Sequence, residues 1–293
     1  MFDPILFPTD GSEAATTALE HVLDVAAGHD ATVHLLNVVD TAPDSVVDVT
    51  DAVLEELDAE GERIVTHAAD RANDRGVPTI TRVQHGDPYR AILDYAEAQD
   101  IALIALPTHG RRGLQRLMLG STTERVLRRA TTPVLTIRPT ADAPPSYPYR
   151  EVLVPTDGSR CARAALDLGI DVVDAEAATL HLLTVVDALQ LGVDVRTDLQ
   201  LDLLEEAAHQ IVEDATDHAA SAGIDSLAGT VEVGSSIHGA IRDYVDDHDI
   251  DLVVTGTHGR SGLDRYLLGS VAETLIRTAP VPVLAVRAAE DDS

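Results

Sequence analysis

The stretch Val152-Leu-Val-Pro-Thr-Asp-Gly-Ser159 decides the fold of this 293-residue chain, because a short apolar strand leads in it directly into a polar turn. Nearly the same residues occur 147 positions earlier, as Ile5-Leu-Phe-Pro-Thr-Asp-Gly-Ser12. A later block, Pro133-Val-Leu-Thr-Ile-Arg138, matches Pro282-Val-Leu-Ala-Val-Arg287 at an offset of 149. The chain is therefore an internal duplication. We predict domains at 1–138 and 150–288, joined by a proline-rich, extended linker at 139–149.

Short β-rich apolar runs alternate in each copy with longer segments of helical periodicity. In the second copy, strands are expected near residues 151–155, 178–186, 228–233, 250–255 and 282–286. This alternation is typical of a parallel sheet that is covered by helices on both faces. The sequence therefore predicts an α/β fold of two tandem doubly wound domains, each with five strands. Right-handed crossovers would place all strand carboxyl ends at one edge, where such sheets bind ligands.

The charge of the chain is strongly acidic, with 50 Asp and Glu against 21 Lys and Arg and a formal net charge of −29. All of the cations are arginine, since the sequence contains no lysine. Together with 45% hydrophobic residues, this favours a folded protein with the acidic surface of a halophile, stable where salt screens self-repulsion. A GC-rich genome would explain the arginines but not the acidic excess. Nucleic-acid binding is not expected, because no basic face is visible.

Compartment and membrane signals are few. Cys161 is the single cysteine, so no intrachain disulfide can form. No apolar run approaches the ~18 residues of a membrane span, and the N-terminus lacks the basic start of a signal peptide. We expect a cytoplasmic protein with no membrane partner.

Glycines lie at the end of the predicted fourth strand and at the start of the next helix. In the second copy these are Gly256-Thr-His-Gly259 and, after nine intervening residues, Gly269-Ser270. The first copy has the same layout, Pro107-Thr-His-Gly110 and Gly120-Ser121, with proline in place of the first glycine. A glycine loop that leads to a helix N-terminus lets backbone N–H groups approach a phosphate. The motif predicts a two-part phosphate cradle, complete in the second copy.

Local capping offers an alternative interpretation of several of these residues. Ser121 with Glu124, and Ser270 with Glu273, fit the spacing of a capping box. Asp10 and Asp157 fit a helix N-cap as well as a ligand contact, and the two roles are compatible.

Neutralisation of a phosphate cannot come from lysine here. It must come from backbone N–H groups, hydroxyls, Arg260 or Arg265, or a divalent cation. His109 and His258 lack an acidic partner at a useful spacing, so we assign them to shaping the loop and predict no catalytic residue. The remaining histidines show no metal-site spacing, and no metal ligand is assigned to the protein alone.

The repeated motifs resemble those of the universal stress protein family, over nearly all of both halves. The family's signature is Gly, two residues, Gly, nine residues, Gly-Ser/Thr, and the second copy has it complete. The resemblance implies a five-stranded parallel sheet of order 3-2-1-4-5, of the adenine nucleotide alpha hydrolase-like (HUP) type. It also implies ATP at the carboxyl edge between the first and fourth strands. Another adenine nucleotide stays open there, and Mg²⁺ or Mn²⁺ could bind through its phosphates. Such proteins commonly dimerise through their fifth strands, so the two domains could form an intramolecular pseudo-dimer, with a homodimer still open.

The resemblance assigns nucleotide-binding residues position by position. In the second domain, Asp157 and Val185 would hold the adenine and ribose end. The full set there is Pro155, Thr156, Asp157, Val185, Thr255, Gly256, Gly259, Gly269, Ser270 and Val271. The equivalent set in the first domain is Pro8, Thr9, Asp10, Val38, Leu106, Gly110, Gly120, Ser121 and Thr122. Pro107 departs from the motif, since it has no N–H and carries a ring. We therefore expect the first domain to bind weakly or not at all.

Three functions follow as hypotheses. The first is a cytoplasmic ATP-binding stress protein whose nucleotide acts as a structural or regulatory ligand. The second is a slow ATPase or an adenylyl-transfer enzyme of the same superfamily. The third is an interaction module without nucleotide, in which the glycines only shape turns.

Overall fold

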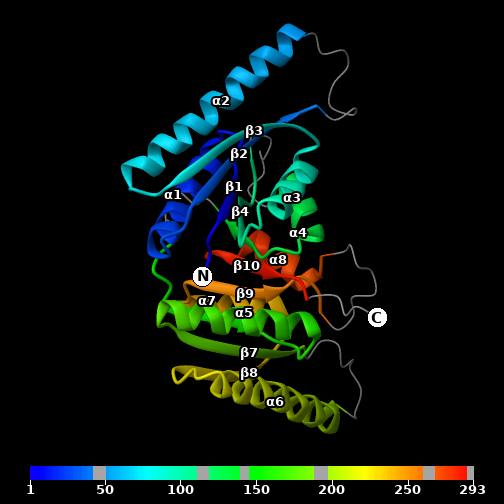
Figure 1. Cartoon of the computed structure of the whole chain (residues 1–293). Helices are drawn as coiled ribbons and strands as arrows, with labels where there is room; N and C mark the ends of the chain where they lie inside the picture. Colours follow the sequence, from blue (N-terminus) through cyan, green and yellow to red (C-terminus); the bar gives the residue numbers. More distant parts are fainter. Residues whose placement is uncertain (42–50, 111–118, 139–144, 188–196, 260–267, 289–293) are drawn as a thin grey trace. The chain divides into compact units, whose positions relative to one another are not determined.

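A computed structural model describes residues 1–41, 51–110, 119–138, 145–187, 197–259 and 268–288. The chain divides into two compact units, Met1–Pro148 and Tyr149–Ser293, which are described separately below (Figure 1). Most of the predicted linker, residues 139–144, lies outside the described residues.

Unit 1 is a doubly wound α/β domain. Its elements are β1 (Ile5–Pro8), α1 (Glu13–Gly28), β2 (Val33–Asp40), α2 (Asp51–Asp74), β3 (Thr79–Gly86), α3 (Pro88–Ala98), β4 (Leu103–Pro107), α4 (Ser121–Arg129) and β5 (Val134–Ile137). The strands are parallel and follow the order β3-β2-β1-β4-β5.

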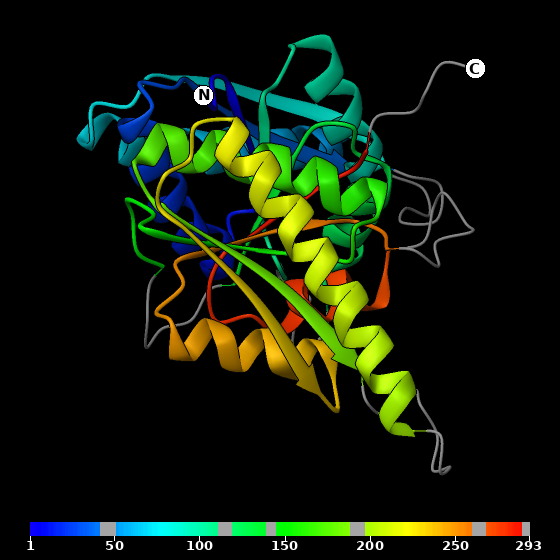
Figure 2. The same cartoon turned by 90° about the horizontal axis from the view of Figure 1, so that it is seen from below.

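Unit 2 repeats this architecture. Its elements are β6 (Glu151–Pro155), α5 (Arg160–Glu176), β7 (Thr179–Asp187), α6 (Thr197–Ser221), β8 (Leu227–Gly234), α7 (Ile237–Asp247), β9 (Leu252–Gly256), α8 (Ser270–Thr278) and β10 (Val283–Val286). The order is β8-β7-β6-β9-β10, again parallel. Figure 2 shows the long helix α6 lying along β7 and β8. Both units confirm the predicted fold class and the order 3-2-1-4-5.

The core of each unit lies between the sheet and its helices. Every residue of β1 and of β4 is buried, as expected for central parallel strands covered on both faces. The edge strand β3 instead mixes half-buried and exposed residues. Beyond the carboxyl ends of these buried strands, the chain enters polar turns.

The described end of the linker is anchored to unit 1. Tyr147 lies so close to Gly28 in α1 that a Cβ there would be 2.7 Å from its ring. Its ring also makes edge contacts with His21 and His29, at centroid distances of 6.5 and 6.4 Å. Beyond it, Tyr149 is 2% exposed and belongs to unit 2.

Candidate nucleotide site

The two central strands of unit 2 part at their carboxyl ends. The ladder between β6 and β9 has two rungs, Val152 with Leu252 and Leu153 with Val253, although both strands continue beyond them. The corresponding ladder in unit 1 is equally short, with Ile5 opposite Leu103 and Leu6 opposite Ile104. In this strand order, that is the point where the connections reverse direction, the usual ligand position in doubly wound sheets. We call this point, where the two central strands stop pairing at the predicted edge, the crevice of each unit.

The turn after β6 is held by its own polar side chains. Thr156 Oγ1 accepts a hydrogen bond from Gly158 N at 3.2 Å, and Asp157 Oδ1 accepts one from Ser159 N at 2.9 Å. Ser159 is the N-cap of α5, and its Oγ accepts from Ala162 N. The N-cap interpretation of Asp157 is thus wrong, because the serine two residues later satisfies the free helix donor.

The turn in unit 1 is built in the same way. Asp10 Oδ1 accepts from Ser12 N at 3.0 Å, and Ser12 caps α1 by accepting from Ala15 N. Asp10 is therefore not the N-cap either. In both units the aspartate closes the turn with one carboxylate oxygen and directs the other elsewhere.

The second carboxylate oxygen lies against the second glycine of the motif. A Cβ at Gly259 would lie 2.9 Å from Asp157 Oδ2, and a Cβ at Gly110 would lie 2.6 Å from Asp10 Oδ2. Residues that follow β6 and β9, about a hundred positions apart in sequence, are therefore adjacent across the crevice. A side chain at either glycine would displace the carboxylate of the aspartate.

The first glycine of the motif faces a helix. A Cβ at Gly256 would lie 2.6 Å from the carbonyl carbon of Cys161 and 2.7 Å from its oxygen and its Cβ. The motif predicts close approach of a phosphate at this position. The contact shows that Gly256 also makes room for the first turn of α5. The equivalent residues of unit 1 are Pro107 and Ala14.

The backbone N–H at this position faces the crevice. Val253 N donates to Pro282 O and Thr257 N donates to Val286 O, so odd-numbered amides of β9 point toward β10. Alternate residues of a strand point to opposite sides, which directs the N–H of Gly256 to the side where pairing with β6 has ended. Pro107 occupies the same place in β4, since Thr108 N donates to Ile137 O of β5. Proline is tolerated there because it removes a donor that the ladder does not use.

Helix α8 begins at the crevice without a side-chain cap. Gly269 is the N-cap, and Gly269 N donates to Thr257 O at 2.8 Å, which closes the base of the loop. Ser270 is the first helical residue and is exposed, so the predicted capping box with Glu273 is wrong. The serine stands one position too late to cap.

Helix α4 has the same start. Gly120 is its N-cap with no side-chain cap bond, and Gly120 N donates to Thr108 O at 2.8 Å. The capping box predicted for Ser121 and Glu124 is therefore also wrong. Helix N-termini without a side-chain cap present backbone donors and a positive dipole end, which suit an anion.

The loop histidines bond within the loop. His258 Nδ1 and Thr257 Oγ1 lie 2.9 Å apart, and His109 Nδ1 and Thr108 Oγ1 lie 3.1 Å apart. Both pairs join neighbouring residues of the loop, which is compatible with the predicted role of these histidines in shaping it.

The remaining candidate residues surround the same edge. Val185 on β7 and Val38 on β2 are half-buried near the ends of their strands. Residues that end the central strands or begin the helices complete the set: Pro155, Thr255 and Val271 in unit 2, and Pro8, Thr9, Leu106 and Thr122 in unit 1. Arg260 and Arg265, the candidate phosphate ligands, lie outside the described residues. Within the described part of the chain, no group of three or more His, Cys, Asp or Glu is placed to hold a metal ion.

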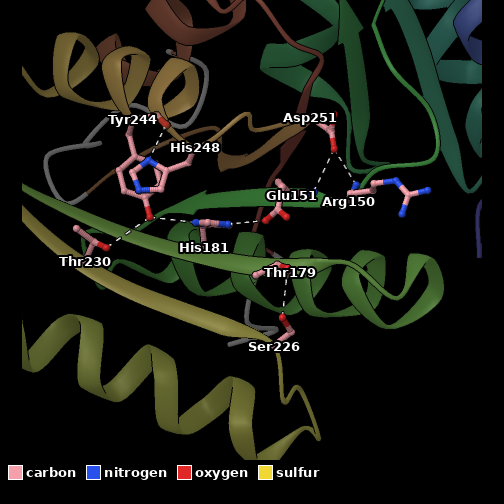
Figure 3. A network of polar contacts seen from close by, with 9 residues as sticks. All are labelled: Arg150, Glu151, Thr179, His181, Ser226, Thr230, Tyr244, His248 and Asp251. Carbon is pink, nitrogen blue, oxygen red and sulfur yellow. Dashed lines mark hydrogen bonds and ion pairs between the residues drawn. The ribbon is translucent and has the colours of Figure 1, made fainter.

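A polar network around the buried side chains of His181 and Tyr244 in unit 2 was not predicted (Figure 3). His181 bridges Glu151 and Tyr244, with Nε2 at 2.7 Å from the carboxylate and Nδ1 at 3.0 Å from the hydroxyl. Thr230 Oγ1 lies 3.4 Å from the same hydroxyl, and the ring of His248 stacks on Tyr244 at 3.8 Å. A histidine within an apolar strand, repeated in both copies, was the available signal. Glu151 and His181 lie in the first residues of β6 and β7, at the opposite end of these strands from the candidate site.

Unit 1 has a reduced form of this network. His34 Nδ1 lies 3.0 Å from the hydroxyl of Tyr95, and Pro4 stands where unit 2 has Glu151. Burial lowers the pKa of His34 below its ordinary value. Burial likewise lowers the pKa of His21, beneath Tyr147, to about 4. Burial thus favours the neutral form of both histidines.

Each unit also has a pocket of about 190 Å³ between its first two helices. The pockets share only turn residues with the candidate site, Thr9 and Gly11 in unit 1 and Thr156 and Gly158 in unit 2. The other lining residues come from the helices: Thr16, Leu19, Glu60, Arg63, Ile64, His67, Ala68 and Arg71 in unit 1, and Arg163, Leu166, Ile211, Asp214, Ala215 and His218 in unit 2.

Comparisons with known proteins agree with the geometry. The sequence profile of the universal stress protein family matches residues 1–138 and 148–287. A universal stress protein of Methanocaldococcus jannaschii is 33% identical over 141 residues, 47% of this chain and 83% of the relative. One from Bacillus subtilis is 30% identical over 148 residues, 47% of this chain and all of the relative.

Solved structures extend the likeness to both units. The crystal structure of a universal stress protein from Archaeoglobus fulgidus has a TM-score of 0.74 and 24% identity, and 98% of each chain is covered. Its likeness supports the fold. None of the helices in the described segments is long and apolar enough to span a membrane. Since the family profile covers nearly the whole chain, twice in succession, the chain belongs to the universal stress protein family.

Proposed function

We propose that this chain binds an adenine nucleotide, ATP, in the crevice of unit 2 and uses it as a structural or regulatory ligand in a stress response. The supporting observation is the contact of Asp157 with Gly259 beside the start of α8, which has no side-chain cap. It joins a carboxylate suited to ribose hydroxyls to backbone donors suited to phosphates.

The residues present fit a phosphate chain without lysine. Donors on one side are the N–H groups of Gly256 and Gly259; on the other they are the first amides of α8 and the hydroxyl of Ser270. Mg²⁺ or Mn²⁺ bound through the phosphates would offset the repulsion from a chain of charge −29. The described residues offer no cage for the ion, so the nucleotide itself would carry it.

Cytoplasmic location and pairing of the units through β5 and β10 belong to the same proposal. The single cysteine supports a reducing compartment. Sheets with exposed edge strands are commonly protected by pairing, which supports β5 and β10 as contact strands.

The test is a titration of the full chain with MgATP in molar KCl, combined with analysis of nucleotide released on denaturation. At 100 times its dissociation constant, a ligand stabilises by about 2.7 kcal/mol. For a unit of this size, that raises Tm by about 5–10 °C. One tight equivalent per chain is expected. No rise in Tm with ATP would favour the interaction module, and steady phosphate release would favour the enzyme.

A matched pair of variants locates the site. Gly259→Ala displaces Asp157 in unit 2 and should weaken tight binding by about tenfold or more, as expected for losing a charge-assisted contact. Gly110→Ala makes the same change against Asp10 in unit 1 and should leave tight binding unchanged. Equal effects of both variants, or an effect of Gly110→Ala alone, would refute the assignment to unit 2.

A further inference from the structure

Three arginine side chains gather around one tyrosine on the α3–α4 face of unit 1. The guanidinium carbons of Arg129, Arg125 and Arg90 lie 5.0, 5.2 and 5.7 Å from the ring centroid of Tyr89. Arg90 Nε also donates to the hydroxyl of Tyr89 at 2.9 Å. We call these four residues the Tyr89 cluster. Helices α3 and α4, which carry it, lie side by side in Figure 1.

The Tyr89 cluster is positive in a chain that is otherwise acidic. Cation–π attraction holds each guanidinium over the ring, but three like charges on one ring repel one another. The carboxylate of Asp87 is 3.8 Å from Arg125, and the charges of Asp87 and Asp94 act on Arg90. The four residues of the cluster themselves carry three positive charges and no negative one.

The cluster is open to solvent. Arg90 and Arg129 are exposed, and the side chain of Arg125 is 55% exposed. Tyr89 is the second residue of α3, and the N-cap Asp87 makes no side-chain cap bond. The positive end of the α3 dipole therefore adds to the field of the guanidiniums.

Unit 2 shows that the fold does not require this arrangement. At the equivalent positions of α7 and α8 it has His238, Gly239, Thr274 and Thr278. Those helices have the same lengths and pack together without any arginine at these four places. The Tyr89 cluster is therefore an addition to unit 1, the unit with the altered glycine motif.

We propose that the Tyr89 cluster is an oxyanion site that binds a phosphoryl group. Guanidinium forks match phosphate oxygens in pairs, and Arg125 and Arg129, one turn apart on α4, present two forks to one ligand. Bound phosphate would relieve the repulsion among the three cations. The ligand is either free phosphate or a phosphomonoester carried by a small molecule, and both share this chemistry.

The experiment titrates the full chain by calorimetry with inorganic phosphate and, separately, with glycerol phosphate. The variant Arg125→Thr/Arg129→Thr introduces the residues that unit 2 has at these positions, so it should fold; circular dichroism verifies this. We expect saturable binding in the natural chain and a loss of about tenfold or more in the variant, as for removal of charge-assisted hydrogen bonds. Preference for one ligand distinguishes the two sources.

The control removes two exposed arginines elsewhere, as Arg63→Thr/Arg242→Thr, whose side chains are 70% and 60% exposed. It changes the net charge equally and should leave phosphate affinity within about twofold, because screened surface charges act weakly. Equal weakening in both variants, or heats that never saturate, would overturn the site. MgATP affinity of the Arg125→Thr/Arg129→Thr variant should stay unchanged, so failure here is separate from failure of the nucleotide proposal.

Discussion

Replacement of Gly256 by alanine should destabilise unit 2 even in the absence of nucleotide. The added Cβ would lie 2.6 Å from the carbonyl carbon of Cys161 and 2.7 Å from its carbonyl oxygen. Both are backbone atoms in the first turn of α5, so they cannot rotate away as the end of a side chain can. Either α5 or the end of β9 must move.

The size of the effect follows from this contact. Overpacking of a well-packed site costs about 1–3 kcal/mol. A loss of 2 kcal/mol lowers Tm by about 4–8 °C for a unit of this length. Gly259→Ala is the matched control, because its Cβ would lie 2.9 Å from Asp157 Oδ2, and that carboxylate can turn aside. Its stability cost should stay below about 1 kcal/mol, since reduced freedom of the unfolded chain offsets part of it.

Calorimetry of both variants, with amide hydrogen exchange of peptides from α5 and β9, measures the difference. Peptides from α1 and β4 of unit 1 serve as the internal reference. Gly256→Ala should speed exchange in unit 2, whereas Gly259→Ala should chiefly weaken ATP binding. A Gly256→Ala chain as stable as the natural one would refute the packing role of this glycine, and the position would then serve the ligand alone.

Three further measurements test the buried histidines and the surface charge. Burial lowers the pKa of His21 from the ordinary 6.5 to about 4, so the unfolded chain binds this proton before the folded chain does. The free energy of unfolding is therefore unaffected by His21 above pH 6.5 and falls between pH 6.5 and pH 4, by at most about 3 kcal/mol. Urea unfolding at pH 7 and 4.5 should show a smaller loss for His21→Leu than for the natural chain, and an equal loss contradicts the reasoning. Tyr244→Phe removes a hydroxyl near both His181 and Thr230 and should lower the free energy of unfolding by about 1–2 kcal/mol. Tyr95→Phe, whose hydroxyl contacts His34, should lower it by less. Amide hydrogen exchange in β7 for the first variant and in β2 for the second measures the difference. The free energy of unfolding should rise between 0.1 and 1 M KCl, where the Debye length falls from about 10 to 3 Å; a flat profile would argue against self-repulsion by the charge of −29.

The fold was predictable because its signals are local and repeated. Central parallel strands are buried on both faces, so β1 and β4 read as continuous apolar runs. A turn residue or glycine marks the end of each of these strands, and the second copy repeats the spacing between the strands of the first. The placement of Asp157 and Gly259 at one edge followed from topology alone.

The capping pattern was not predictable, because it depends on contacts outside the local sequence. Ser270 and Glu273 have capping-box spacing, but the hydrogen bond from Gly269 N to Thr257 O fixes where the helix begins. The choice between Asp157 and Ser159 as the cap of α5 likewise depends on the length of the turn. The role of Gly256 required knowing that α5, which begins 96 residues earlier at Arg160, passes directly over it.

The difference between the two candidate nucleotide sites comes down to the backbone at one position. Asp10, Gly110 and Gly120 keep in unit 1 the contacts that their counterparts make in unit 2. What Pro107 changes is the N–H that would face the crevice, because its neighbour Thr108 still bonds β5. A hydrogen bond to a charged group contributes about 1.5–3 kcal/mol, which corresponds to a factor of about 10–150 in affinity. The inequality between the units should therefore be one of strength, with a tight site and a second site weaker by that factor, rather than one of presence and absence.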